Sequence, residues 1–345
     1  MATMPEHAPV SQPKSQPSPI LFFETINAHE RTEVLRSAIE LDVFTAISEG
    51  ARTAEQLATR CQASARGMRI LCDYLTTLGF ITKSGDRYAL TPDSEMFINR
   101  KSPAYLGGTV EFLLSPGLLD RTKEITACVR KGGALVDYPS EPNNPMWVTF
   151  ARAMAPLMLL PAKLIADLLK ASSAPAWKVL DIAAGHGTFG IELGQQNRSA
   201  EIFAVDWENV LEVAKENAQR AGVTNRYHTI PGSAFDVQFG QGYDIALITN
   251  FVHHFDKPMN EKFLGKVRQA LNDGGRAVIL DFIVDEDRVN PPLAAQFAMK
   301  MLNGTADGDV YTFSDIETVL RNAGYSSSEL HPLPPTFERV VIGKK

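Results

Sequence analysis

The most informative part of this chain is VLDIAAGHGTFGIELG, Val179 to Gly194, followed by EIFAVDWENV, Glu201 to Val210. An apolar strand runs into a turn that contains Gly185 and Gly187, a helix follows, and a second strand ends at Asp206. Glycines let the backbone turn tightly and approach a ligand, and a carboxylate that ends the next strand can accept both hydroxyls of a ribose. The pattern therefore predicts a site for a nucleoside cofactor.

Two cofactor classes share this pattern. Gly185, Gly187 and Gly190 spell GxGxxG, which is also the fingerprint of dinucleotide-binding Rossmann folds. Asp181 stands just before the turn, where a negative charge opposes a pyrophosphate and attracts a cation. S-adenosylmethionine carries a sulfonium and an amino group and has no phosphate. The acidic flank therefore favours S-adenosylmethionine over NAD.

Further segments carry a family resemblance. They are GSAFD at 232–236, ALITNFVHHF at 246–255, GGRAVILDF at 274–282 and the ending LHPLPPTFERVVIG. With the N-terminal module, they resemble the class I S-adenosylmethionine-dependent small-molecule O-methyltransferases of the acetylserotonin and caffeic acid type, in their bacterial branch. The resemblance covers about residues 20 to 345. It implies S-adenosylmethionine as cofactor, S-adenosylhomocysteine as product, no metal, and a homodimer formed through the N-terminal domain.

Strand and helix patterns alternate in the C-terminal half. They predict strands at 178–182, 201–205, 227–231, 244–249 and 276–282, which indicate a doubly wound parallel sheet. After a helix at 312–323, strands at 327–333 and 338–342 are close enough to pair antiparallel. A dinucleotide fold ends instead in a parallel unit. The expected fold class is α/β, a Rossmann-like class I methyltransferase sheet with a C-terminal antiparallel hairpin, plus a mainly α N-terminal winged-helix dimerisation domain.

The N-terminal module has a winged-helix pattern. Helical spacing over 20–48, helices at 54–60 and 64–78, and a hairpin at 80–90 produce it. Such modules often read DNA, and Arg66 and Arg69 would be the contacts. However, acidic residues slightly outnumber basic ones up to residue 100, and Asp73 lies on the same helix. We therefore expect dimerisation, with the apolar first helix at the interface through Phe22, Phe23 and Ile26.

Composition limits the function classes further. The 345 residues are 44% hydrophobic and 21% charged, enough for two domains with full cores. A net charge of −6 and a pI near 5.7 disfavour nucleic acid and anionic membranes as partners. Cys61, Cys72 and Cys128 form no disulfide or metal pattern, and no apolar run approaches ~18 residues. We expect a cytoplasmic protein with a disordered tail at 1–19, the dimerisation domain at 20–105, helices of a linker and substrate cavity at 106–172, and the catalytic domain at 173–345.

Ligands of such sheets bind at the carboxyl ends of the strands. Asp206 would hold the ribose and Trp207 would cover the adenine. Ala183 replaces the first glycine that the family usually has, and His186 is expected to act through its backbone. The expected cofactor residues are Asp181, Gly185, Gly187, Asp206, Trp207, Ser233, Ala234, Phe235 and Asn250.

The segment NFVHHF supplies a base. A phenol with a pKa near ~10 is mostly protonated at neutral pH, and a neutral histidine can accept its proton, which contributes ~10² to 10⁴ in rate. Aligned on the family's W-V-L-H, the resemblance makes His254 the base and puts His253 at a leucine position. Asp281 aligns with one acidic residue that orients the base, and Val310 replaces the second. The expected catalytic residues are therefore His254 and Asp281.

The acceptor cavity is expected to be apolar, with aromatic and thioether walls that suit a flat aromatic or polyketide-like molecule. Core packing is the alternative interpretation for such residues at helical spacing. The reaction expected is O-methylation of a phenolic or enolic hydroxyl. C-methylation, or non-methylating chemistry on the same scaffold, is the alternative; an NAD-dependent oxidoreductase and a winged-helix regulator are more distant. The substrate-binding candidates are Phe150, Met154, Phe251, His253, Phe297, Met301, Leu302 and Tyr311.

Overall fold

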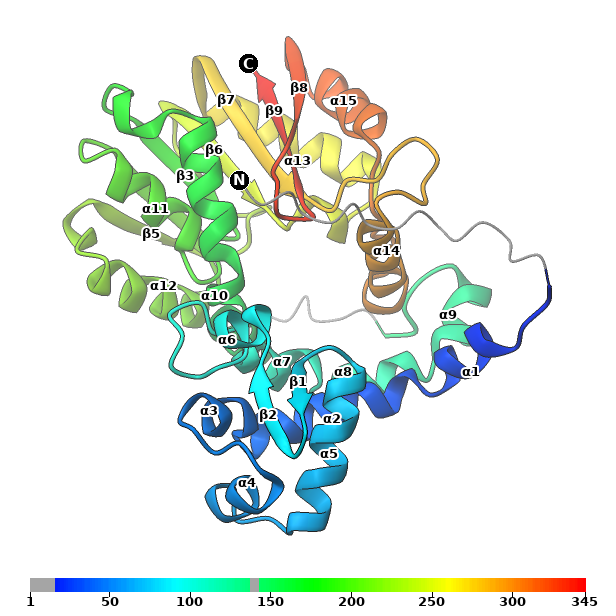
Figure 1. The fold of residues 1–345 in the computed structure, drawn as a ribbon. Coiled ribbons are helices and arrows are strands. Elements are labelled where there is room, and N and C mark those ends of the chain that lie inside the picture. The colour runs from blue at the N-terminus through cyan, green and yellow to red at the C-terminus, as the bar shows by residue number, and fades with distance from the viewer. Residues whose placement is uncertain (1–15, 137–142) are drawn as a thin grey trace. The chain divides into compact units, whose positions relative to one another are not determined.

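The computed structural model describes residues 16–136 and 143–345, and Figure 1 shows the order of the elements. The chain divides into two compact units, Met1–Gly107 and Gly108–Lys345. The segment 106–172, expected as a linker, forms no unit of its own and belongs mostly to the second one. Of the expected disordered tail, the first 15 residues lie outside the described part of the chain.

The N-terminal unit is mainly helical, with one hairpin. The helical stretch predicted at 20–48 is three helices, because the chain turns at Asn27 and again at Asp42, whose φ of 58° is left-handed. A capping box between Thr53 and Gln56 starts the next helix. The elements are α1 (Ile20–Ile26), α2 (Ala28–Glu40), α3 (Val43–Ser48), α4 (Ala54–Arg60), α5 (Ala65–Thr77), β1 (Ile81–Ser84), β2 (Arg87–Leu90) and α6 (Pro92–Phe97).

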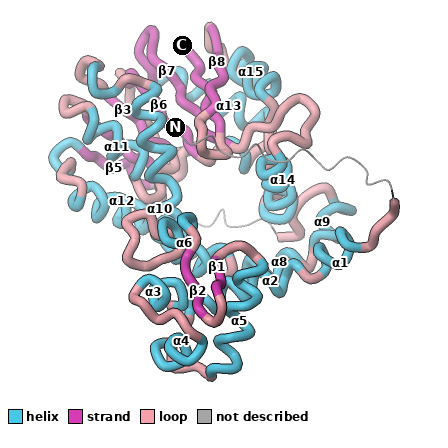
Figure 2. The backbone as a smooth tube through the Cα atoms, in the orientation of Figure 1, coloured by secondary structure: helices cyan, strands magenta, loops and turns pink. Residues whose placement is uncertain are grey.

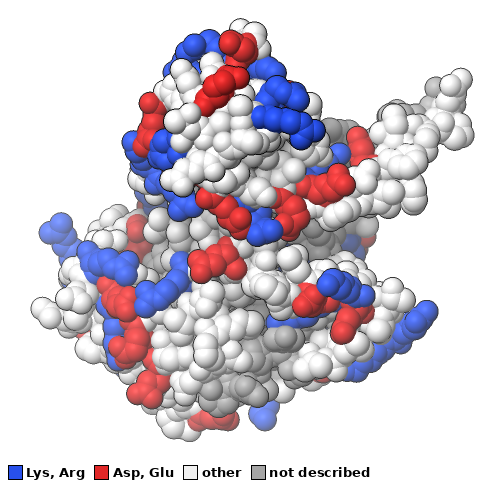
Figure 3. Space-filling model, turned by 90° about the horizontal axis from the view of Figure 1, so that it is seen from below, with Lys and Arg blue, Asp and Glu red and all other residues white. Residues whose placement is uncertain are grey.

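Charges of both signs are mixed on the hairpin side of this unit. Asp73 on α5 accepts hydrogen bonds from Lys83 at 2.5 Å, from Tyr88 at 2.7 Å and from Arg69 at 2.9 Å. These partners, Lys83 first, lower the pKa of Asp73 to about 2. On the face drawn in Figure 3, acidic and basic side chains are interspersed. A DNA-reading helix needs an unneutralised basic face, and Asp73 engages Arg69.

Short helices and one long helix precede the sheet. The helical region at 107–131 is broken before Pro116 and again at Glu124. The elements are η1 (Gly107–Thr109), α7 (Val110–Leu113), α8 (Pro116–Thr122), α9 (Ile125–Lys131), α10 (Pro145–Leu168) and η2 (Ala171–Ser173). By length and composition alone, α10 is long and apolar enough to cross a membrane. The sequence pattern does not predict a helix of this kind. Its buried residues, Met158, Ala162 and Ile165 among them, belong to the core of the second unit.

The second unit contains a seven-stranded sheet in the order β5-β4-β3-β6-β7-β9-β8, and only the pairings of β9 are antiparallel. The predicted C-terminal hairpin is confirmed as β8–β9. The strands are β3 (Lys178–Ile182), β4 (Glu201–Asp206), β5 (Tyr227–Pro231), β6 (Tyr243–Thr249), β7 (Leu271–Asp281), β8 (Ser327–Pro332) and β9 (Arg339–Lys344). The helices are α11 (Thr188–Gln196), α12 (Glu208–Arg220), η3 (Thr224–Arg226), η4 (Val252–His254), α13 (Lys257–Ala270), α14 (Pro292–Gly304) and α15 (Phe313–Asn322).

Helices cover both faces of this sheet, as Figures 1 and 2 show. Because side chains alternate along a strand, neighbouring residues belong to different cores. Val179 lies in the core with α10, α11 and α12, whereas Leu180 lies in the core with α13 and α15. The predicted α/β class and methyltransferase-like sheet are confirmed. Their strand ends bring the site residues to one edge.

Candidate active site

The glycine turn after β3 is tied to the end of β4. The amide of Gly185 donates to Oδ2 of Asp206 at 2.8 Å, and the amide of Trp207 donates to Oδ1 at 2.7 Å. Burial raises the pKa of Asp206 to about 6, against the effect of these two donors. Each carboxylate oxygen keeps a second lone pair. Asp206 can therefore hold the turn and still accept ribose hydroxyls.

Asp181 lies beneath the turn. Its side chain is fully buried, and Oδ2 accepts the amide of Gly190 at 3.0 Å, inside the first turn of α11. A Cβ on Gly190 would come within 2.6 Å of that oxygen, so only glycine permits this approach. Burial raises the pKa of Asp181 to about 7. Through Oδ2 the carboxylate holds the helix that follows the turn, whereas Oδ1 is buried without a hydrogen-bond partner. The contact of Asp181 with the cofactor stays a prediction.

The turn itself uses left-handed backbone. Gly185 and Gly187 have φ of 56° and 74°, and a Cβ on Gly187 would come within 2.6 Å of the Tyr227 hydroxyl. Ala183 has a φ of 52°, a conformation that costs an alanine about 1–2 kcal/mol. His186 contributes more than its backbone, because its buried Nδ1 accepts the amide of Thr188 at 3.1 Å at the start of α11. Burial lowers the pKa of His186 to about 4, which keeps Nδ1 an acceptor.

The expected adenine-edge segment lies against an aromatic cluster. Ser233 accepts the amide of Phe235 at 3.2 Å, and Ala234 is buried. The Phe235 ring lies 6.2 Å from that of Phe251 and 4.9 Å from that of Phe255. Phe251 was expected in the acceptor cavity. It packs beside the adenine-edge segment, on the α13 face of the sheet, and its place in the acceptor cavity stays a prediction.

A buried histidine and carboxylate meet where β6 and β7 end. Nδ1 of His253 lies 2.6 Å from Oδ1 of Asp281, and each side chain is 4% exposed. The amide of Phe282 also donates to Oδ1, at 2.7 Å. Because an ionised carboxylate only accepts hydrogen bonds, the Nδ1 proton points at Asp281 and Nε2 keeps a free lone pair. Such a histidine is oriented to accept a proton.

The predicted pairing of Asp281 with His254 is therefore wrong. Residues Val252–His254 form the 3₁₀ turn η4, in which successive side chains point about 120° apart, so one of two adjacent histidines faces Asp281. The His254 ring lies 4.3 Å from the His253 ring and 6.3 Å from that of Trp147. Burial, and then the charge of His253, lower the pKa of His254 well below its ordinary value. His254 is thus a weaker base than an ordinary histidine.

Two aromatic groups flank the histidines. Phe297 of α14 stacks on Phe282 with the ring centres 3.7 Å apart, and Phe337 stacks on Phe282 at 5.5 Å. The Phe297 ring also lies 4.9 Å from that of His253. Near His254, Trp147 and Phe150 of α10 lie with their rings 5.7 Å apart. The sequence pattern does not predict Phe282 or Phe337 as site residues. Each is adjacent to an acidic residue at the end of a strand, and that adjacency is the signal that could have identified them.

The other expected cavity residues are dispersed. Tyr311 is buried, donates its hydroxyl to the carbonyl of Phe255 and packs in the α13 core. Its role as a cavity residue stays a prediction. Met301 is 7% exposed on α14, one turn after Phe297. Met154 and Leu302 are half-buried, on α10 and α14. Asn250 lies at the turn between β6 and η4 and has a φ of 52°.

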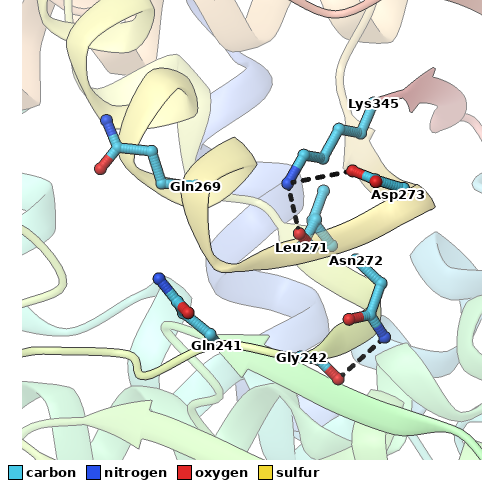
Figure 4. A pocket seen from close by; sticks show the side chains of 7 residues that line it. All are labelled: Gln241, Gly242, Gln269, Leu271, Asn272, Asp273 and Lys345. Carbon is cyan, nitrogen blue, oxygen red and sulfur yellow. Dashed lines mark hydrogen bonds and ion pairs between the residues drawn. The ribbon is translucent and has the colours of Figure 1, made fainter.

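A separate surface pocket lies at the opposite end of the sheet (Figure 4). It is lined by Gln241, Gly242, Gln269, Leu271, Asn272, Asp273 and Lys345, which surround the starts of β6 and β7. Its polar groups bind one another. For example, the ammonium of Lys345 donates a hydrogen bond to the Leu271 carbonyl at 2.6 Å. Within residues 16–136 and 143–345 no group of three or more acidic, histidine or cysteine side chains could hold a metal ion.

Known proteins resemble this chain in sequence. Residues 23–100 match the O-methyltransferase dimerisation domain, and residues 144–326 match the O-methyltransferase domain. The chain is 28% identical over 343 residues, 95% of each chain, to the 3-hydroxy-5-methyl-1-naphthoate 3-O-methyltransferase of Streptomyces sahachiroi.

Two solved structures are similar over nearly their whole length. A putative O-methyltransferase from Nostoc punctiforme is 50% identical, with a TM-score of 0.91 that covers 96% of this chain and all of that one. Human N-acetylserotonin methyltransferase in complex with SAM is 19% identical, with a TM-score of 0.81 over 97% of this chain and 99% of that one. At that identity the likeness is one of fold.

Proposed function

This chain belongs to the O-methyltransferase family, and we propose that it methylates a phenolic or enolic hydroxyl of an aromatic or polyketide-like small molecule, with S-adenosylmethionine as donor and His253 as the general base. The observation that carries the choice of base is the 2.6 Å contact between His253 Nδ1 and Asp281 Oδ1. His254, which the family alignment favoured, is without a carboxylate partner among the described side chains.

His253 and Asp281 can manage the proton of the acceptor hydroxyl. Nε2 of His253 accepts that proton as the oxygen forms its bond to the methyl carbon, and Asp281 stabilises the imidazolium that results. S-adenosylmethionine, when bound, would supply the methyl group and would leave as S-adenosylhomocysteine, whose sulfur keeps the electron pair of the carbon–sulfur bond. Atoms and charge balance, because the proton leaves the oxygen as the methyl group arrives. No oxidant or metal takes part in this scheme.

The residues of the β3 and β4 ends fit that cofactor. Two carboxylates, Asp181 and Asp206, lie at the turn, where they favour a cationic sulfonium compound over a pyrophosphate. Asp206 would hold the ribose, and the amides of the Gly185–Gly187 turn would face the amino-acid part of the cofactor. Ser233, Ala234 and Phe235 would border the adenine.

An aromatic acceptor fits the surroundings of His253. The rings of Phe282, Phe297 and Phe337 form a stack, and flat aromatic molecules pack well on such surfaces. The relative from Streptomyces sahachiroi is named for a hydroxynaphthoate, which supports a fused aromatic acceptor. Oxygen is the atom that the family's name assigns, so C-methylation and non-methylating chemistry are not favoured.

We also propose a homodimer in the cytoplasm. Residues 23–100 match a dimerisation domain, and α1 buries none of its residues, with Leu21 and Phe22 74% and 63% exposed. An exposed apolar helix in such a domain fits a second copy of the chain. Cys61, Cys72 and Cys128 are free thiols, which fits a reducing compartment.

The test is mass spectrometry of purified protein with S-adenosylmethionine and a panel of hydroxynaphthoates, catechols and hydroxyquinones. We expect a product one methyl heavier, mapped to oxygen, that falls ~10²-fold or more with His253→Ala. His254→Ala is the matched control, with less than about a tenfold effect expected. Full turnover by His253→Ala would refute the base, and a methyl mapped to carbon would refute O-methylation.

A further inference from the structure

A second buried acid lies close to the His253–Asp281 pair. Glu338 directly precedes β9, is 2% exposed, and reaches the sheet edge where Arg339 pairs with Asp281 and Val340 with Leu280. Its neighbour Arg339 is engaged by Asp285 at 2.6 Å. Glu338 therefore lies in the interior while the cation beside it is bound to another carboxylate.

The partner of Glu338 is Asn250. The side-chain amide of Asn250 lies close enough to the Glu338 carboxyl to lower its pKa. Asn250 also donates its backbone amide to Leu280 at 2.8 Å and its side-chain amide to the sulfur of Met158 at 3.5 Å. Since Asn250 has a left-handed φ of 52° and stands three residues before His253, these contacts hold the turn that carries the base.

Two oxygens of this pair are buried without a partner, Oε1 of Glu338 and Oδ1 of Asn250. Both are acceptors if Glu338 is ionised, and unpaired buried acceptors are costly. A single proton on Glu338 gives both oxygens a hydrogen bond. The carboxyl O–H can donate to Oδ1 of Asn250, while the Asn250 amide donates to the other carboxyl oxygen. Burial raises the pKa of Glu338 to about 7, and the charge of Asp281 raises it while the Asn250 amide lowers it.

We propose that Glu338 is a positioning residue that, as a neutral acid, makes a two-hydrogen-bond pair with Asn250 and so fixes the turn that presents His253 for proton transfer. This rests on the proposed function of His253. When Glu338 ionises, the pair loses its O–H donor, and a second negative charge faces that of Asp281. The groups that act on Glu338 are Asp281 of β7 and the Asn250 amide after β6, with Met158 of α10 packed on Asn250.

The protonation state is tested without any acceptor. Thermal unfolding of the full chain is followed from pH 5 to pH 8.5 for the wild type, for Glu338→Gln, and for the control Glu111→Gln on α7, an exposed acid that makes no ion pair among the described residues. A carboxyl with a folded pKa above its unfolded one stabilises the fold at low pH, and this contribution is lost as the pH rises through about 7. Wild type should therefore lose several degrees of Tm relative to Glu338→Gln across this range. A constant difference, equal to that of the control, would overturn the neutral acid.

The positioning role is tested by kinetics at pH 6.5 and across the alkaline range. Glu338→Gln keeps a donor and an acceptor, so we expect kcat within about threefold of wild type and no loss between pH 7 and pH 9, where the wild type declines. Glu338→Leu removes both and should lower kcat about tenfold, with the KM for S-adenosylmethionine nearly unchanged. If Gln and Leu lower kcat equally, or neither changes it, the positioning role is wrong. If no acceptor is methylated by wild type, the proposed function fails, and the unfolding series still decides the state of Glu338.

Discussion

The two units treat their carboxylates in opposite ways. In the N-terminal unit, Asp73 lies at the surface among Lys83, Arg69 and Tyr88, and its pKa is lowered to about 2. In the C-terminal unit, Asp181 and Glu338 are buried with backbone amides or an amide side chain as partners, and each has a pKa raised to about 7. A carboxylate without a cation costs stability in the interior, so its presence there marks a site of function.

The apolar residues show the reverse distribution. The N-terminal unit exposes Phe22 and Phe23 of α1, whereas the C-terminal unit fills both faces of its sheet with buried side chains. The first unit therefore offers a surface to a partner, and the second offers a site to small molecules. A substitution in one unit, compared with a similar substitution in the other, should therefore affect either dimerisation or catalysis but not both.

The largest effect is expected at α1. The double substitution Phe22→Ser and Phe23→Ser removes four aromatic side chains from a homodimer, each worth about 1.5–3 kcal/mol when buried. The dissociation constant should rise by about 10⁴ or more, which light scattering after size exclusion would record as a monomer. Met259→Ser on α13, an exposed apolar residue of the other unit, is the control and should stay dimeric. A double variant that is still a dimer at micromolar concentration would remove α1 from the interface.

The same change in the two acids tests the comparison directly. Asp281→Asn takes the charge from the partner of His253 and should lower kcat by about 10²-fold with unchanged cofactor affinity. Asp73→Asn should leave kcat unchanged and cost up to about 1 kcal/mol of unfolding free energy, as surface pairs do. Steady-state kinetics and denaturant unfolding measure both. Comparable losses of kcat in the two variants would contradict the contrast between the units.

Cofactor affinity should depend on Asp206. Because burial raises the pKa of Asp206 to about 6, its carboxylate is present at pH 7.5 and becomes protonated as the pH falls through about 6. A protonated carboxyl accepts hydrogen bonds from the ribose hydroxyls more weakly than a carboxylate does, so the Kd of S-adenosylmethionine should rise several-fold from pH 7.5 to pH 5. Calorimetric titration measures this, and Asp206→Asn should bind weakly at all pH values. An affinity that is constant over this range would show that Asp206 is not a ligand.

The smallest effect concerns the turn after β3. Ala183→Gly relieves a left-handed alanine at a φ of 52°, and the entropy of a more flexible unfolded chain offsets part of the gain. We expect stabilisation by about 0.5–1 kcal/mol in denaturant unfolding, with cofactor affinity unchanged. Ala184→Gly, at a buried neighbour without left-handed φ, should destabilise instead. A destabilised Ala183→Gly would show that the alanine methyl group contributes more than its conformation costs.

Much of the C-terminal fold was predictable, because local patterns carry it. Strands at 178–182 and 227–231 have the predicted bounds, since apolar runs between turn residues define them. β7 begins five residues before its predicted start, because the polar residues at 272–275 continue a strand that periodicity does not show. The pattern over 20–48 does not separate its three helices, because apolar spacing persists across the breaks at Asn27 and Asp42.

By itself the sequence determined the cofactor class, the sheet and its terminal hairpin, and the position of a histidine pair at the end of β6, because each depends on residues close together in the chain. Only the tertiary structure decided which histidine meets Asp281, since a one-residue offset in a 3₁₀ turn redirects a side chain by about 120° while hardly changing an alignment. It also brought Glu338 to Asn250, 88 residues away in the printed sequence (338 − 250), which no local pattern can encode.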